Sequence, residues 1–172
     1  MGFKYTCHTC GKEHVGFPDL AFSAPRHYYD VRKEDRASQA VLTTDTCVIR
    51  NEWFFVRGIL PIPVHGLDDG FRYGVWVSLS RQRFDRYQEL FNESEPNEPP
   101  YFGWLANRLR TYPDTELLKT SMYLQPYPGR PVISFHPAEH PLVVEQRDGI
   151  SQERLQEILE ANLHPAPRSP SP

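Results

Sequence analysis

The stretch that decides the fold runs from residue 41 to residue 80 and reads VLTTDTCVIRNEWFFVRGILPIPVHGLDDGFRYGVWVSLS. It contains two of the three tryptophans and the densest apolar segments of the chain. β-branched and aromatic residues, which favour strands, are concentrated in three of its segments: Cys47–Arg50, Trp53–Val64 and Phe71–Leu79. Because the apolar face of a sheet has to be covered by a second layer, we expect the flanking segments to supply that cover.

Downstream of this stretch, helices and further strands follow one another. Ser80 is a favourable N-cap, and apolar residues recur at helical spacing up to residue 92. Three later segments have strand character, and two more have helix character: 101–105, 117–124, 132–135, then 141–147 and 151–163. The sequence therefore predicts an α+β fold, in which an antiparallel sheet of about six strands is covered by a few short helices.

The length of 172 residues suits a single domain. We expect one α+β domain over residues 1–164, of which residues 1–40 form an N-terminal CxxC knuckle and an irregular segment interrupted by prolines. Residues 165–172 read PAPRSPSP, a composition that cannot continue a helix and predicts a disordered tail.

Composition excludes several classes of protein. The net charge of −3 gives no basic excess for a nucleic-acid backbone, so we expect no direct binding to nucleic acid. No apolar segment is long enough to cross a membrane, and the N-terminus lacks the apolar region of a signal peptide. Three cysteines, an odd number, do not form a disulfide framework. These features predict a reduced, cytoplasmic protein.

The N-terminal segment YTCHTCGKEH carries the strongest candidate for chemistry. Cys7 and Cys10 have the CxxC spacing of a zinc knuckle, and Gly11 allows the turn to close. A structural zinc ion needs four ligands, and a second CxxC is absent. Histidines and the third cysteine are the candidates for the missing positions: His8, His14, His27 and Cys47. The spacing is compatible with bound zinc and equally with a free dithiol.

Other polar clusters give weaker signals. His136 and His140 are four residues apart with an acid between them, but Pro137 and Pro141 forbid the continuous helix of a zincin site. We therefore expect His140 to cap the helix that begins at Pro141. Glu145 has no partner carboxylate for general acid–base catalysis. No catalytic residue is predicted.

Two features suggest surfaces for a partner. The last helix carries acidic residues on the side opposite its apolar face, namely Glu153, Glu157 and Glu160. Trp76 lies opposite the apolar set of its strand, where it either packs against a second layer or forms part of a binding surface.

Taken together, these stretches resemble a bacterial family of unknown function, domain-of-unknown-function family 2199. The resemblance extends from the CxxC to the last helix and rests on six stretches: CHTCGKEH at 7–14, DTCVIRNEWFFVRGILPIPV at 45–64, YGVWVSLS at 73–80, PPYFGWL at 99–105, RP at 130–131 and HPLVVEQRDGIS at 140–151. The family implies no enzymatic activity. Its pattern includes the candidate metal ligands Cys7, Cys10, His14 and Cys47, which is compatible with a structural zinc site; the spacing alone does not show whether Cys47 reaches the knuckle.

The chain is also similar to immunity proteins of type VI secretion systems, which bind and neutralise a nuclease effector. This resemblance implies a non-catalytic binding protein in the cytoplasm whose partner is a cognate nuclease toxin. Charge complementarity between an acidic surface and a basic nuclease would favour such binding. The alternatives are a structural zinc-binding domain and an uncharacterised metal-dependent enzyme.

Overall fold

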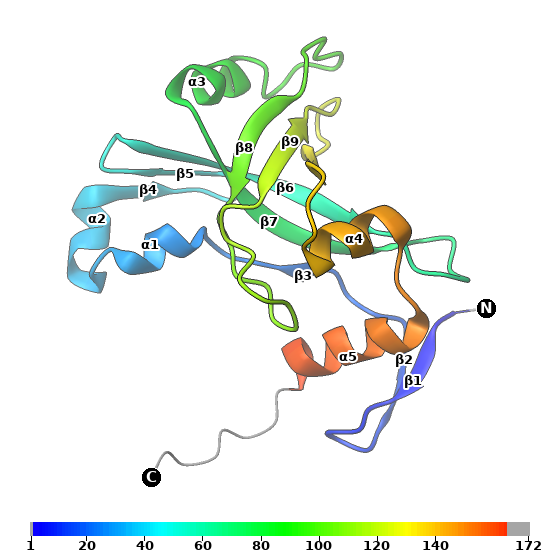
Figure 1. Cartoon of the computed structure of the whole chain (residues 1–172). Helices are drawn as coiled ribbons and strands as arrows, with labels where there is room; N and C mark the ends of the chain where they lie inside the picture. The colour runs from blue at the N-terminus through cyan, green and yellow to red at the C-terminus, as the bar shows by residue number, and fades with distance from the viewer. Residues whose placement is uncertain (1, 165–172) are drawn as a thin grey trace.

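The computed structural model describes residues 2–164 (Figure 1). The predicted tail at 165–172 lies outside the described residues. At the centre is the hairpin of β6 (Trp53–Ile62) and β7 (Phe71–Leu79), whose antiparallel register runs from Phe54↔Leu79 to Ile62↔Phe71. The alternating side chains of both strands divide between two apolar faces, so β6 and β7 are buried along nearly their whole length.

The hairpin continues into a closed barrel. β8 (Tyr101–Leu105) pairs with β7, β9 (Lys119–Tyr123) with β8, and β10 (Val132–Phe135) with β9, all antiparallel. β10 then returns to β6 and pairs with it in parallel at Val132↔Ile59, which closes the ring β6-β7-β8-β9-β10.

Further strands extend the sheet on both sides of the barrel. β5 (Thr46–Ile49) pairs with β6, and β4 (Ala40–Leu42) pairs with β5 at one edge. On the other side β3 (Leu20–Ala21) lies parallel to β7. The α+β class is confirmed. The single antiparallel sheet of about six strands is corrected, because two pairings are parallel and the strands curl into a barrel.

Three helices begin where the sequence predicts, although the first ends at Glu89 rather than at residue 92. α3 (Arg81–Glu89) and α5 (Gln152–Leu163) start after serine caps, and α4 (Pro141–Asp148) starts after His140. Each capping side chain accepts a hydrogen bond from a backbone amide of the first turn, as N-caps do. Two shorter helices precede the central strands: α1 (Arg26–Asp30) and α2 (Arg36–Gln39), with a 3-10 turn at Lys33–Asp35 between them. No helix within residues 2–164 has the length and apolar character needed to cross a bilayer.

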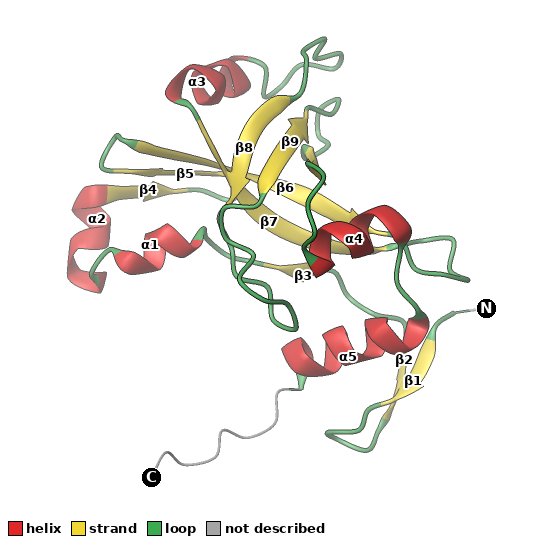
Figure 2. Ribbon diagram, in the orientation of Figure 1, coloured by secondary structure: helices red, strands yellow, loops and turns green. Residues whose placement is uncertain are grey.

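The sheet separates two apolar cores. The larger fills the barrel and extends to the N-terminal hairpin, where Tyr5 and Cys7 join it, and to α5. The smaller core lies on the opposite face of the sheet. There Cys47, Phe55 and Trp76 pack together with Val31, the residue that follows α1. Figure 2 shows the corresponding division of the helices, with α1 and α2 beside β4 and α4 and α5 toward the N-terminal hairpin.

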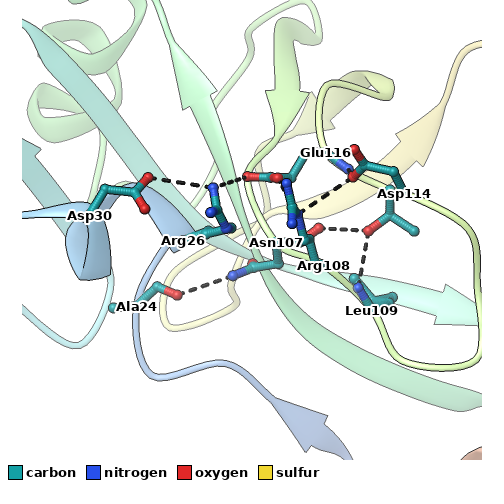
Figure 3. Close-up of polar contacts among 9 residues, drawn as sticks. Ala24, Arg26, Asp30, Asn107, Arg108, Leu109, Asp114 and Glu116 are labelled. Carbon is teal, nitrogen blue, oxygen red and sulfur yellow. Dashed lines mark hydrogen bonds and ion pairs between the residues drawn. The ribbon is translucent and has the colours of Figure 1, made fainter.

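A polar network fastens the N-terminal cover to the loop after β8 (Figure 3). Asn107 is buried, donates to the carbonyl of Ala24 at 3.1 Å and accepts from the Trp76 amide at 2.7 Å. Nearby, the Glu116 carboxylate accepts from Arg26 at 3.4 Å and from Arg108 at 2.5 Å. These contacts tie the N-terminal segment to the loop after β8, which indicates a structural role.

Candidate metal centre

The candidate centre is built on an N-terminal hairpin. β1 (Lys4–Thr6) pairs antiparallel with β2 (Glu13–Val15). Between them the chain turns tightly, because the Gly11 amide donates to the Cys7 carbonyl at 2.8 Å and the Cys7 amide donates to the Lys12 carbonyl at 2.9 Å. Gly11 has a φ of 68°, a left-handed conformation that glycine adopts without steric cost.

The turn directs backbone amides at a sulfur atom. The Cys10 amide donates to the Cys7 Sγ at 3.4 Å. Burial by itself would raise the pKa of the Cys7 thiol, but hydrogen bonds from the amides of Cys10 and Thr9 outweigh it, and the pKa is lowered. A thiolate is the form of cysteine that binds metals, so the hairpin favours the ligating state.

Two histidines complete the cluster from different ends of the chain. His14, on β2, stacks on Tyr5 and has its Nε2 3.3 Å from the Cys10 Sγ. His164 is the C-cap residue of α5, and its ring lies 5.0 Å from that of His14. The ligand atoms of Cys7, Cys10, His14 and His164 all lie within 4.8 Å of one another.

The donor set matches a structural zinc site. Two cysteines and two histidines are among the common ligand sets of structural zinc, whose tetrahedral geometry separates neighbouring ligand atoms by about 3.3–3.8 Å. The present cluster therefore needs only a small inward movement of its side chains. It is the one grouping of potential metal ligands within residues 2–164.

Hydrogen bonds hold α5 against the hairpin next to the cluster. Glu160 accepts from the His8 amide at 2.8 Å, and Gln156 donates to the Thr6 carbonyl at 2.9 Å. Burial opposes ionisation of Glu160, but hydrogen bonds from Gln156 and His8 prevail and lower its pKa. Figure 1 shows the result, α5 lying alongside β1 and β2. These contacts hold α5, and with it His164, beside the hairpin that carries the other three candidate ligands.

The ligand set predicted from the sequence requires one correction. Cys7, Cys10 and His14 come together, but Cys47 does not join them. Cys47 lies on β5 opposite Phe55 and faces the smaller core, whereas Cys7 belongs to the larger core on the other side of the sheet. Burial raises the pKa of Cys47 to about 12, so it is a neutral core thiol. His164, at the end of a helix, takes its place.

Of the residues predicted to contact a partner, some are buried or face the hairpin and others are exposed. Trp76 has no exposed surface, and its indole N–H donates to the Phe22 carbonyl at 2.9 Å, so it belongs to the second layer rather than to a docking surface. Glu160 faces the hairpin as described above. Glu153 and Glu157 remain exposed on α5, and Glu157 pairs with Arg154 at 3.0 Å.

The polar cluster around α4 lies outside the metal centre. The His140 Nδ1 accepts from the Leu142 amide, which is the helix cap that the sequence predicts. His136 contacts the Ser121 hydroxyl at 3.0 Å. Glu145 is held by Arg154 at 2.9 Å and by the Tyr112 hydroxyl at 2.5 Å. Each of these groups has a structural partner.

Sequence reasoning overlooked His164. The signal available was the four-ligand rule together with the position of this histidine directly after the predicted last helix. What the sequence does not carry is the direction in which that helix folds back along the N-terminal hairpin.

Comparison with known proteins identifies a family. The family described as "Uncharacterized protein conserved in bacteria (DUF2199)" matches residues 6–150. The match covers most of the chain, so the chain belongs to this family. No curated protein and no solved structure matches. The match includes three of the four clustered ligands and ends before His164.

Proposed function

We propose that this member of the DUF2199 family is a non-catalytic binding protein whose first and last elements are joined by a structural zinc ion. The observation that carries the proposal is the convergence of Cys7, Cys10, His14 and His164, whose ligand atoms lie within 4.8 Å of one another. The zinc would be held entirely by protein ligands. Such closed sites are structural, whereas catalytic zinc keeps a position for water or substrate.

The role of this zinc follows from where its ligands lie. Three come from the hairpin and one from the end of α5, so the ion would link the start of the described chain to its end. The hydrogen bonds of Glu160 and Gln156 to the hairpin connect the same two elements. Zinc bound only to the folded arrangement contributes its binding free energy to folding.

Metal analysis tests this proposal. Full-length protein is purified without affinity metals or chelators, and its zinc content is measured by mass spectrometry. We expect about one zinc per chain, as four-ligand sites bind. Less than about a tenth of an equivalent, after refolding with zinc as well as before, contradicts the proposal.

A binding role is favoured by a separate observation, an aromatic strip on the outside of the barrel. Phe102, Trp104 and Tyr123 on β8 and β9 expose 46%, 37% and 44% of their surface. Phe102 and Trp104 pack edge to face at 5.1 Å, and Lys119 lies over the Trp104 ring at 5.9 Å. Rigid exposed aromatic side chains are enriched among the residues that dominate protein interfaces.

We propose that the partner is a nuclease effector toxin of a type VI secretion system, and that the chain acts in the cytoplasm as its immunity protein. The aromatic strip would supply the contact area. The exposed carboxylates of Glu153 and Glu157 on α5 would attract a basic nuclease, since complementary charge raises association rates and specificity.

Co-purification tests the partner. The chain is co-expressed with the product of the neighbouring toxin gene, and the complex is isolated by size-exclusion chromatography. Trp104→Ala is expected to weaken binding at least tenfold, as loss of a central interface aromatic does. Tyr29→Ala removes an exposed aromatic side chain on α1 and serves as the matched control. Absence of a toxin gene and of any complex contradicts the immunity role and leaves the zinc proposal standing.

A further inference from the structure

Of the three cysteines, two lie side by side, one of them exposed and one buried, and the third lies apart in the smaller core. Cys10 is exposed, Cys7 is buried directly beneath it, and both contribute to the metal cluster. Cys47 is buried on the opposite face of the sheet. The same fold therefore holds one pair of sulfurs, of which the Cys10 member is exposed, and one isolated buried sulfur.

We propose that Cys7 and Cys10 form an oxidant-sensitive modification site, at which a peroxide converts the two zinc-bound sulfurs into a disulfide and releases the zinc. This inference rests on the proposed zinc site and adds its regulation. The oxidant is hydrogen peroxide or another hydroperoxide, a class that oxidises accessible thiolates.

The geometry allows the bond to form without rearranging the hairpin. The two sulfur atoms lie within 4.8 Å, and the cysteines are joined by a turn in which the Cys10 amide already contacts the Cys7 Sγ at 3.4 Å. A disulfide requires the sulfurs to approach to about 2.0 Å, which side-chain rotation supplies when the backbone already brings the residues together.

The reaction balances as two successive displacements. The exposed Cys10 thiolate attacks one peroxide oxygen, which breaks the O–O bond, forms a sulfenic acid and releases hydroxide. The Cys7 thiolate then attacks the Cys10 sulfur, forms the S–S bond and expels a second hydroxide. Two electrons pass from the sulfurs to the peroxide, two protons convert the hydroxides to water, and Zn²⁺ leaves without changing its charge.

Loss of the two thiolates dismantles the site. His14 and His164 alone do not supply the four ligands of a structural zinc. α5 keeps its other contacts with the hairpin, among them those of Glu160 and Gln156 and the shared apolar core. Oxidation would therefore remove the metal link between His164 and the hairpin while the barrel stays closed.

Cys47 provides an internal control. Its side chain has 0% exposure and, unlike the buried Cys7, it has no exposed cysteine beside it that could react first. A buried neutral thiol reacts slowly with peroxide. The proposal therefore predicts that oxidation consumes two of the three thiols and leaves one.

The test uses zinc-loaded, full-length protein treated with one equivalent of hydrogen peroxide and then with a modest excess. Released zinc is measured with a chromogenic chelator, free thiols are counted after denaturation, and peptide mass spectrometry locates the disulfide. We expect one zinc released and two thiols lost per chain, a Cys7–Cys10 link, and recovery of zinc binding after a thiol reductant. Cys47→Ala is expected to leave the stoichiometry of zinc release unchanged.

The outcomes separate the two proposals. A chain that binds zinc and keeps it in excess peroxide overturns the inference alone. Zinc release that accompanies sulfinic acid at Cys10, or a disulfide that involves Cys47, also overturns it. A chain that never binds zinc overturns the proposed function and this inference together.

Discussion

At the scale of single residues, His164 distinguishes this site from one confined to the hairpin. His8 and His164 both lie where the hairpin meets α5, but only His164 belongs to the ligand cluster, while His8 contacts Glu160. The two histidines therefore form a natural pair for substitution.

His164→Ala is expected to weaken zinc binding about a hundredfold or more, because even the loss of an outer contact costs metal sites about 10–100-fold. His8→Ala, the control, is expected to change affinity by about tenfold or less, the low end of that range, since His8 contacts Glu160 and none of the four ligands. Competition with a fluorescent zinc chelator measures both. Equal affinities for His164→Ala and the wild type would remove this histidine from the ligand set.

A second residue-scale prediction concerns pH and Glu98. The side chain accepts from Arg86 at 2.9 Å and from the Tyr101 hydroxyl at 3.0 Å, and these hydrogen bonds, led by Arg86, hold its pKa below the ordinary 4.5. A group with a lowered folded pKa stabilises the fold above its ordinary pKa and loses that contribution as the pH falls through the lowered value.

Glu98→Gln is therefore expected to lower the thermal midpoint at neutral pH. The difference in thermal midpoint between the variant and the wild type is expected to be smaller at about pH 3, which lies below the ordinary pKa of a carboxyl group. Thermal unfolding followed by circular dichroism at the two pH values measures this. A difference that persists unchanged in acid would show that the carboxylate is not the stabilising group.

At the scale of elements, closure of the barrel depends on Gly58. A Cβ at this position would lie 2.7 Å from Ile133 side-chain atoms and 2.9 Å from the Pro131 carbonyl oxygen. The absence of a side chain thus allows β10 to reach β6, where the parallel pair Val132↔Ile59 closes the ring.

Gly58→Ala is expected to destabilise the protein by about 1–3 kcal/mol, the range for overpacking a core. Gly11→Ala serves as a control. Gly11 has a positive φ but open space around its Cβ position, so this substitution introduces backbone strain without overpacking. Ile133→Val combined with Gly58→Ala is expected to recover part of the loss, because it removes one of the clashing atoms. Urea unfolding measures the free energies, and strictly additive effects would contradict direct contact.

The same elements show what the sequence could and could not predict. Ser80, His140 and Ser151 cap helices where expected, and the strands from β5 to β10 occupy the predicted segments, because these signals are local. The barrel closure was missed because it rests on one short pairing between distant strands. His164 was missed for the same kind of reason: its position depends on how α5 packs against the hairpin.

At the scale of the whole molecule, the proposed zinc joins elements from opposite ends of the described chain. A strong chelator is expected to lower the thermal midpoint of the wild type, since a ligand held about a thousandfold above its dissociation constant contributes about 4 kcal/mol. The same chelator is expected to lower the thermal midpoint of His164→Ala by much less, because a hundredfold weaker affinity leaves about 1.4 kcal/mol of that contribution. A similar shift in both proteins would place the metal elsewhere.

X-ray absorption at the zinc edge tests the central claim most directly, because it counts the atoms around the ion. The account predicts two sulfurs at about 2.3 Å and two nitrogens at about 2.0–2.1 Å. Three sulfurs and one nitrogen would mean that Cys47 reaches the ion in place of a histidine, and a shell of only oxygen and nitrogen would mean that the hairpin cysteines do not bind it; either result would contradict the account.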